Sequence, residues 1–556
     1  MGETLMPTIT VNKKEIMKLM GKTLPDIQLR EKIVMLGTDL KEIKGNEITL
    51  EVFPNRPDLL SEQGLGRALA SFTGKKTGLR KYDVKKSGYS VIVEPSVKNV
   101  RPFTACAIVK GLNFDNEKIK EIIQIQEKLH ITFGRNRKRC AIGIYPLEHI
   151  KMPIHYKALP PKNIKFIPLE ANKEMNGLQI LKDHPTGREY GFLLENYDKY
   201  PVFIDAKNDV LSMPPIINSH KTGKITNKTQ EVFIECSGHD FRVLKECLNM
   251  IVTTLADMGG KVFSMDVVYG KKKHITPDLE PRKMKLDLDY INKRLGLDIK
   301  ESQAKHLLEK MGFGYEKKEV LIPAYRTDII HQVDLAEDIA IAYGYENFEE
   351  TIPKVATIGW EDPLEMFADK IRCVLVGHGL IEVKNYCLCD SKVQKDKMNL
   401  NLNLVRIANP SSEEYDVMRT WLIPCLLYVL REYKHHEYPH DIFEIGTIFN
   451  VDTKQDTGVL EDLRVAVTLC NPESDFTKIK QIFDSLMEAL DLKYEIEDTD
   501  HPSFISGRVG RITVNKQYVA YMGEIHPEVL ENFDLKMPVA AFELNLSELL
   551  KAMRRK

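Results

Sequence analysis

Four acidic side chains lie close together in the stretch "RTDIIHQVDLAEDIAIAYGYEN", residues 326–347. They are Asp328, Asp334, Glu337 and Asp338. A helix advances by about 100° per residue, so a helix that starts near Asp334 carries the last three on one face. A hard divalent cation prefers oxygen ligands, and this spacing would permit the carboxylates to share one.

The alternative for the same acids is structural. Carboxylates in the first turn of a helix interact favourably with the helix dipole and cap free N–H groups. The rest of the stretch supports the helix itself, because four side chains at i, i+4, i+7 and i+8 predict a face packed on the core. These are Leu335, Ile339, Ala342 and Tyr343. Ile341 lies on the acidic face instead, which indicates that a partner covers that face.

A second group of polar residues occurs where the sequence otherwise predicts buried strands, in "YPVFIDAKNDVLSMPPIINS" and "VFIECSGHDF". The group consists of Ser212, Asn218, Glu235 and Ser237. Buried polar groups need hydrogen-bond partners, and the pattern therefore permits a polar pocket. The alternative is that these residues belong to strand edges and turns, with a hairpin closed at residues 208–209.

A run of cations follows Gly134 in the stretch "RNRKR". It contains Arg135, Arg137, Lys138 and Arg139. Such a run can neutralise phosphates and make nucleic-acid binding sensitive to salt. A solvated edge of the protein is the alternative.

Two stretches resemble nucleotide-binding motifs, but each lacks a required glycine. The stretch "GLGRAL" lacks the third glycine of a dinucleotide fingerprint, and "TGKKTG" lacks the first glycine of a phosphate loop; Leu69 stands at both positions. The sequence also has no zinc-ligand spacing, nucleophile elbow or kinase signature.

Charge and cysteine usage bound the class of protein. Lys and Arg number 79 against 80 Asp and Glu, giving a net charge of −1, so any nucleic-acid contact must be local. Nine cysteines without a CxxC pair are typical of a reduced, cytosolic chain. No apolar run approaches the roughly 18 residues that span a bilayer, and the first residues lack an apolar signal core. We therefore expect a cytoplasmic protein without membrane contact.

A chain of 556 residues is too long for one core and predicts three or four domains. Strand and helix patterns alternate along it, and polar linkers separate the segments. We expect a multidomain α+β protein. Its segments are an N-terminal α+β domain over residues 1–88, a second α+β domain over residues 89–274, a small helical domain over residues 275–352, and a domain of long helices and strands over residues 353–556.

Several stretches together resemble one family, the β subunit of phenylalanyl-tRNA synthetase in its archaeal and eukaryotic form. The resemblance covers nearly the whole chain, and such an ordered set of motifs is highly specific. The motifs are "MPTITVNKKEI", "VFPNRPDLLSEQGLGRAL", "RPFTACAIV", "FGRNRKRCAIGI", "VLSMPPIINS", "FIECSGHDF", "RTDIIHQVDLAEDIAIAYGYEN", "ANPSSEEYDVMRTWLIPCLL" and "IFEIG". The sequence departs from the family at "IGIYPLE", where Tyr145 and Pro146 replace a His-Asp pair.

The resemblance implies a heterotetramer of two α and two β subunits that joins phenylalanine to tRNA(Phe) with ATP, with the chemistry mostly on the α subunit. In that family the helical domain is similar to DNA-binding domains and holds one Mg²⁺ shared with the α subunit, which serves assembly. The implied ligands are Asp328, Asp334, Glu337 and Asp338. The cationic run from Arg135 to Arg139 would contact tRNA phosphates.

The family's second domain is an editing domain, which hydrolyses tyrosine wrongly attached to tRNA(Phe). The residues that the resemblance places in its pocket are Phe203, Ser212, Glu235 and Ser237. Glu235 would bind the tyrosine hydroxyl. A buried acceptor gains a hydrogen bond from tyrosine and is left unpaired by phenylalanine, so the correct product is rejected.

The last domain resembles the antiparallel sheet of a class II synthetase without its active site. Class II catalysis needs an arginine on a motif strand and a glycine-rich strand and helix ending in arginine, which clamp ATP phosphates. The comparable strand reads "DIFEIG", and "SGRVGRIT" has the wrong spacing. We therefore predict no catalytic residue for aminoacylation, and expect apolar surfaces such as "MRTWLIPCLLYVL" to serve assembly. A free-standing editing hydrolase and a pseudo-synthetase binding scaffold are the alternatives.

Overall fold

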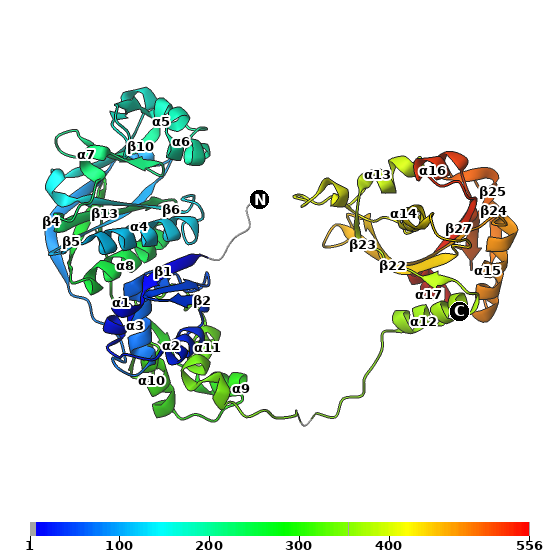
Figure 1. Cartoon of the computed structure of the whole chain (residues 1–556), viewed down its shortest axis with the longest axis horizontal. Helices are drawn as coiled ribbons and strands as arrows, with labels where there is room; N and C mark the ends of the chain where they lie inside the picture. Colours follow the sequence, from blue (N-terminus) through cyan, green and yellow to red (C-terminus); the bar gives the residue numbers. More distant parts are fainter. Residues whose placement is uncertain (1–6, 354, 555–556) are drawn as a thin grey trace. The chain divides into compact units, whose positions relative to one another are not determined.

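The computed structural model describes residues 7–353 and 355–554. The chain forms two compact units, Met1–Thr351 and Ile352–Lys556 (Figure 1). This division falls beside the boundary predicted at residue 352, whereas the boundaries predicted at residues 88 and 274 lie inside the first unit. Among the described residues, no helix is long and apolar enough to cross a membrane.

The first unit begins with a three-stranded antiparallel sheet in the order β1-β3-β2 and with three helices. These elements are β1 (Thr8–Asn12), α1 (Lys13–Met20), α2 (Asp26–Met35), β2 (Asp39–Lys44), β3 (Glu47–Glu51) and α3 (Glu62–Phe72). The glycines of "GLGRAL" lie in α3, where a Cβ at Gly66 would come within 2.6 Å of Leu19 on α1. This glycine therefore serves the close approach of two helices.

A ten-stranded sheet follows, in the order β12-β11-β10-β7-β4-β14-β5-β13-β6, with β15 paired to β14. Its strands are β4 (Val84–Val93), β5 (Phe103–Lys110), β6 (Cys140–Pro146), β7 (Ile154–Leu159), β10 (Tyr200–Ile204), β11 (Val210–Met213), β12 (Ile217–Asn218), β13 (Glu231–Gly238), β14 (Lys261–Tyr269) and β15 (Lys272–Thr276). The two ends of this order meet, because the Tyr145 hydroxyl on β6 lies 3.3 Å from Asn218 Oδ1 on β12. The sheet therefore curls around an apolar core that includes Tyr156, Phe203 and Phe233.

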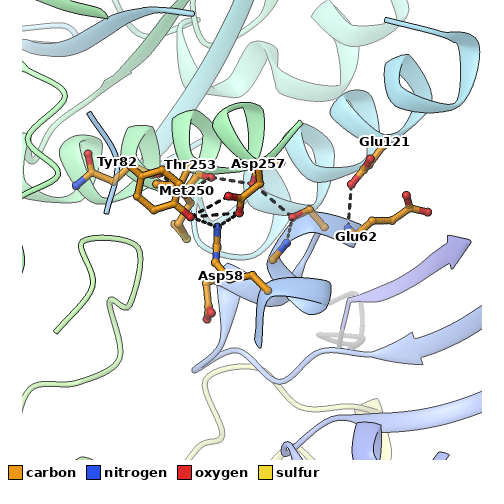
Figure 2. Close-up of polar contacts among 12 residues, drawn as sticks. Asp58, Glu62, Tyr82, Glu121, Met250, Thr253 and Asp257 are labelled. Carbon is orange, nitrogen blue, oxygen red and sulfur yellow. Dashed lines mark hydrogen bonds and ion pairs between the residues drawn. The ribbon is translucent and has the colours of Figure 1, made fainter. Parts of the chain in front are cut away.

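Helices α4 (Asn116–Ile131) and α8 (Phe241–Asp257) cover the other face of this sheet and join it to the N-terminal elements (Figure 1). Asp257 at the end of α8 accepts hydrogen bonds from Arg67 of α3 at 2.6 Å and from the Tyr82 hydroxyl at 3.1 Å (Figure 2). Glu121 of α4 accepts the backbone N–H of Glu62 at 2.9 Å. One continuous apolar core extends across this junction.

Smaller elements complete the region between the strands. They are the hairpin β8 (Lys165–Phe166) and β9 (Met175–Asn176), and the helices α5 (Gly177–Asp183), α6 (Pro185–Tyr190) and α7 (His220–Gly223).

The last part of the first unit, predicted as a small helical domain, contains three helices and also a three-stranded sheet in the order β16-β18-β17. Its elements are β16 (Arg282–Lys285), α9 (Leu288–Leu295), α10 (Glu301–Lys310), β17 (Gly314–Glu316), β18 (Glu319–Ile322) and α11 (Gln332–Tyr343). Helix α11 is the predicted acidic helix. Its predicted core face is confirmed, because Leu335, Ile339 and Ala342 are buried in the same core as the N-terminal elements.

The second unit is built on a seven-stranded sheet in the order β19-β22-β23-β27-β26-β25-β24. Its strands are β19 (Ile381–Glu382), β22 (Ile442–Val451), β23 (Val459–Cys470), β24 (Glu495–Asp498), β25 (Phe504–Val514), β26 (Gln517–Ile525) and β27 (Val539–Asn545). All pairs are antiparallel except β19 with β22. The predicted antiparallel sheet is therefore present in this part of the chain.

Side chains alternate between the two faces of this sheet, and each face carries its own apolar core. Val465 and Val467 face the core formed with α12 (Pro363–Gly377), α15 (Phe476–Ala489) and α17 (Leu546–Arg554). Ala466 and Cys470 face the core formed with α14 (Ile423–Tyr433) and α16 (Pro527–Asn532). The short elements α13 (Ser391–Gln394), β20 (Leu388–Cys389) and β21 (Val417–Met418) lie outside the main sheet.

The apolar run expected to serve assembly is largely used inside the second unit. Leu422, Ile423, Leu426 and Leu427 are each fully buried in the core beneath α14, whereas Tyr428 of the same helix is exposed. Most of "MRTWLIPCLLYVL" therefore stabilises this unit itself.

Candidate functional site

A cavity of about 100 Å³ lies at the junction of β6, β11, β12, β13 and α4. Its polar lining includes Arg137, Ser212, Asn218 and Glu235. Three buried polar atoms in this wall, Arg137 Nε, Ser212 Oγ and Glu235 Oε2, have no hydrogen-bond partner within the described part of the chain. Unpaired buried polar atoms are rare in folded proteins and indicate a place for water or a ligand.

Glu235 is the central acid of this cavity. It lies on β13 between Cys106 of β5 and Gly143 of β6, and it is 2% exposed. Burial raises the pKa of its carboxyl group to about 8, so the group is mostly neutral at pH 7. A neutral carboxyl group can both donate and accept a hydrogen bond, which suits it to binding a hydroxyl group.

Glu235 contacts Tyr145, a residue that the sequence did not predict to lie in the pocket. Its hydroxyl lies 3.1 Å from Glu235 Oε1, and its ring is fully buried and stacks on Phe233 with centroids 5.7 Å apart. A Cβ at Gly143 would overlap the Tyr145 hydroxyl, so the absence of a side chain there lets the ring lie across β6. In the sequence, a glycine two residues before Tyr145 on the same predicted strand was the signal that could have revealed this contact.

The four predicted pocket residues divide into two pairs. Ser212 and Glu235 both line the cavity. Phe203 is the cross-strand neighbour of Ser212 but stacks on Tyr156 with centroids 4.3 Å apart, in the core beside the cavity. Ser237 is buried, and its hydroxyl accepts a hydrogen bond from Arg101 Nε at 3.2 Å.

The predicted basic run is not uniformly exposed. Arg137 turns inward, where it pairs with Glu127 at 3.1 Å, donates to the backbone oxygen of Ile216 at 2.8 Å and stacks on Tyr190. Its guanidinium group thus holds the wall of the cavity, a role that the sequence missed. The other three cations remain at the surface: Arg135 and Lys138 are exposed, and Arg139 is half-buried.

The backbone explains the inward turn of Arg137. Arg135, Asn136 and Arg137 have φ angles of 49°, 52° and 62°, so three successive residues are in the left-handed region. A run of this kind reverses the side-chain directions that an extended or helical segment would have. A regular strand edge or helix would have exposed all four cations to solvent.

The acids of the α11 region are arranged around an arginine. Arg326 donates to Asp328 from Nε at 2.9 Å and from Nη2 at 2.7 Å, and the same Nη2 lies 2.7 Å from Asp338 Oδ2. Burial alone would raise the pKa of Asp328, but the charge of Arg326 outweighs it and holds that pKa below its usual value. For Asp338, which is only 4% exposed, burial prevails and the pKa is raised.

The other two acids face different surroundings. Asp334 Oδ2 accepts the backbone N–H groups of Ile330 and His331, both at 2.7 Å, as a first-turn acid is expected to do. Glu337 is exposed. Ile341, which was expected to mark a partner-covered face, is half-buried against the protein's own core.

Within the described part of the chain, the ligating oxygens of the four acids do not all lie within 4.8 Å of one another, whereas the sulfur atoms of Cys140, Cys236 and Cys247 do. These thiols are buried in the apolar core between the ten-stranded sheet and α8, where cysteine packs as a small apolar side chain.

The stretch "DIFEIG" of the second unit leads into β22 and contributes Glu444 to a buried ion pair. Arg419 Nη1 donates to Glu444 Oε1 at 2.6 Å, and the two side chains are 1% and 0% exposed. The arginine next to this strand thus serves a structural contact inside the core.

Comparison with known proteins gives two family models that match this chain. The model described as "Phenylalanyl tRNA synthetase beta chain CLM domain" matches residues 348–546, and "tRNA synthetase B5 domain" matches residues 284–345. The phenylalanine–tRNA ligase β subunit of Pyrococcus abyssi is 42% identical over 98% of this chain and 100% of its own length. The corresponding subunit of Thermococcus kodakarensis is 40% identical over 98% of this chain and 99% of its own length.

A solved structure is similar to part of this chain. The crystal structure of an N-terminal fragment of the phenylalanyl-tRNA synthetase β subunit from Pyrococcus horikoshii has a TM-score of 0.59 and 40% sequence identity. The match covers 61% of this chain and 100% of the fragment.

Proposed function

The chain belongs to the family of phenylalanine–tRNA ligase β subunits, and from this premise we propose that it acts in a complex with a catalytic α subunit and edits tyrosine attached to tRNA(Phe). The complex is an aminoacyl-tRNA synthetase, which joins phenylalanine to tRNA with ATP as the energy source. Because named β subunits match over nearly the whole chain, a free-standing hydrolase or a binding scaffold is not favoured.

The assembly is a heterotetramer of two α and two β subunits in the cytoplasm, with tRNA(Phe) as the nucleic-acid partner. Within it, the chain divides as residues 1–88, 89–274, 275–352 and 353–556, and the last of these is a class II synthetase-like fold that carries no residue for aminoacylation. Mixing the chain with its α subunit and measuring phenylalanylation tests this division of labour. Activity of the isolated chain in exchanging pyrophosphate into ATP with phenylalanine would contradict it.

The cavity at Glu235 carries the editing proposal. Glu235, Ser212 and Asn218 converge there, and Glu235 Oε2 and Ser212 Oγ have no hydrogen-bond partner among the residues that the structure describes. Hydrolysis adds water to the ester carbonyl and breaks its bond to the ribose oxygen, which releases tyrosine and free tRNA. The chain's part is to bind the tyrosyl group: a carboxyl group that pairs with the phenol is left unpaired by phenylalanine, which disfavours the correct product.

The test is deacylation of tyrosyl-tRNA(Phe) by the complex containing Glu235→Ala. We expect hydrolysis to slow roughly ten- to a hundredfold, as for the loss of one buried hydrogen bond of about 1–3 kcal/mol. Phenylalanylation by the same complex is the internal control, because that chemistry lies on the α subunit. Unchanged deacylation would remove Glu235 from the pocket.

A Mg²⁺ ion shared with the α subunit is the second proposal. The ligands would be Asp328, Asp334, Glu337 and Asp338, which offer the oxygen atoms that a hard cation prefers, although both oxygens of Asp328 accept from Arg326. Within the described residues, Asp334 Oδ1, Asp338 Oδ1 and both oxygens of Glu337 accept no hydrogen bond. Arg326 already neutralises part of this charge, so the ion's contribution is to bridge the subunits at the exposed end of the cluster.

Replacing Asp334 and Glu337 by alanine should weaken the association of the α and β subunits and its dependence on magnesium. The matched control is the alanine double variant of the exposed acids Glu349 and Glu350, which removes the same charge nearby. Sedimentation over a range of magnesium concentrations measures both. Equal assembly of the two double variants, including after chelation, would return the acids to a purely structural role.

The surface cations of the run after Gly134 are the proposed tRNA contacts. Arg135 and Lys138 are exposed and Arg139 is half-buried, whereas Arg137 belongs to the cavity wall. Alanine at Arg135 and Lys138 should weaken tRNA binding and flatten its dependence on salt, because each lost phosphate contact reduces the counterion release. An unchanged salt dependence would contradict the assignment.

A further inference from the structure

The group proposed to bind an incoming tyrosine already binds a tyrosine of the chain. The Tyr145 hydroxyl is 3.1 Å from Glu235 Oε1 and 3.3 Å from Asn218 Oδ1. Both of these partners line the cavity. The internal phenol therefore makes the contacts that the phenol of a tyrosyl ester would need.

The local backbone holds Tyr145 in this place. Gly143 and Tyr145 are two residues apart on β6, so they face the same side of the sheet. Gly143 is the direct cross-strand neighbour of Glu235, and any Cβ at this glycine would overlap the Tyr145 hydroxyl. The ring can reach Glu235 only because the position between them has no side chain.

Tyr145 already occupies two of the acceptors at the cavity, Glu235 Oε1 and Asn218 Oδ1. The volume that remains is about 100 Å³, whereas a cavity that holds benzene measures about 150 Å³. A tyrosyl phenol that binds these two acceptors therefore has to displace the Tyr145 hydroxyl.

We infer that Tyr145 is an internal competitor for the editing pocket, which sets the threshold that any aminoacyl ester must overcome before it is hydrolysed. This inference rests on the proposed editing function. A tyrosyl ester exchanges one phenol–carboxyl hydrogen bond for another, so its entry is close to neutral at Glu235. A phenylalanyl ester displaces Tyr145 and leaves Glu235 unpaired, so its entry is opposed.

The competitor acts on both esters equally. Removing the Tyr145 hydroxyl deletes a hydrogen bond that either ester would have to break, and it does not alter what each ester makes with Glu235. Tyr145→Phe should therefore accelerate hydrolysis of tyrosyl- and phenylalanyl-tRNA(Phe) by the same factor, on the order of tenfold for one hydrogen bond. The ratio between the two substrates should stay unchanged. A structural role alone would not produce this pattern.

The experiment measures kcat/KM for deacylation of both esters by the heterotetramer. The variants are Tyr145→Phe, Glu235→Ala and the double variant, beside the wild type. Tyr156→Phe is the matched control, because Tyr156 is equally buried in the same core and its hydroxyl donates to the backbone oxygen of Arg101 at 2.8 Å, away from Glu235. We expect Tyr156→Phe to hydrolyse both esters at wild-type rates.

The outcomes separate this inference from the proposed function. If Glu235→Ala slows hydrolysis but Tyr145→Phe does not accelerate it, the internal competitor is refuted and the editing pocket stands. If Tyr145→Phe accelerates one ester alone, the competitor is likewise refuted. If Glu235→Ala changes neither the wild type nor the Tyr145→Phe background, the proposed pocket itself fails.

Binding of p-cresol, which is the tyrosine side chain without its backbone, gives a measurement independent of hydrolysis. Calorimetry should show that p-cresol binds the complex carrying Tyr145→Ala, about tenfold more weakly when Glu235→Ala is added. It should not bind the wild type, where Tyr145 fills the position. Equal binding with and without the glutamate would overturn the inference, and the Tyr145→Phe kinetics decide it if the alanine variant does not fold.

Discussion

Replacing Arg326 by methionine should strongly destabilise the first unit. The substitution removes three charge-assisted hydrogen bonds to Asp328 and Asp338 while keeping a similar apolar side-chain volume. The arginine, Asp328 and Asp338 side chains are 2%, 11% and 6% exposed, so water cannot replace the lost cation without rearrangement. Removing one partner of a buried ion pair costs about 3–5 kcal/mol, and two carboxylates lose their partner here.

The assay must distinguish the two units. Both tryptophans, Trp360 and Trp421, lie in the second unit. Hydrogen exchange of the first unit's amides therefore follows the unfolding that Arg326→Met affects, and tryptophan fluorescence reports the second unit as an internal control. We expect a loss of about 3–5 kcal/mol in the first unit and no shift in the fluorescence transition.

A matched surface variant sets the scale. Arg372 pairs with Glu382 at 2.9 Å, but the two side chains are 32% and 30% exposed, so Arg372→Met should cost no more than about 1 kcal/mol. Adding Asp338→Asn to Arg326→Met should recover part of the loss, because it removes one unpaired buried charge. A loss below about 1 kcal/mol for Arg326→Met, equal to that of the surface control, would refute the reasoning that this pair is buried and coupled.

Three further outcomes are expected. Burial raises the pKa of Glu121 to about 8. The native state therefore keeps a proton that the unfolded chain loses above about pH 4.3. The contribution of Glu121 to the free energy of unfolding is complete below that pH and declines as the pH rises towards 8. Glu121→Gln should reduce this decline but not abolish it, because the pKa of Glu235 in the same unit is also raised to about 8; unfolding of the first unit at pH 5 and pH 8.5 measures the difference. Arg419→Met should destabilise the second unit by about 3–5 kcal/mol, because it leaves the buried Glu444 with hydrogen bonds from Asn385 but without a cation, and tryptophan fluorescence reads the change. Gly143→Ala should destabilise the first unit by about 1–3 kcal/mol through overlap with Tyr145, and unfolding of a double variant with Tyr145→Ala should show smaller added damage.

The sequence predicted best what depends on neighbours along the chain. The helix near Asp334 and its core face at Leu335, Ile339 and Ala342 follow from spacing alone, and the structure confirms them. The same spacing could not show that Asp338 is buried. Its burial depends on Arg326, which is 12 residues away and is brought against α11 by the loop after β18.

The candidate pocket shows the same limit over longer separations. Glu235 and Ser212 were predicted because polar residues among buried strands need partners. The residues that meet in this region are far apart in sequence: Tyr145 is 73 residues from Asn218 and 90 residues from Glu235. A curled sheet decides which strands meet, and strand order cannot be read from alternation within one strand. Arg137 was misplaced for a related reason, since a left-handed backbone run gives no periodic pattern.

The curled sheet also limits self-association of the first unit. An open strand edge offers free N–H and C=O groups on which another chain can add a strand. Here the terminal strand β12 has two residues, and the opposite terminal strand β6 is contacted by α7 and by Asn218. Shortening the segment between β11 and α7 would uncover β6 along its length, so such deletions should aggregate even where the cores remain intact.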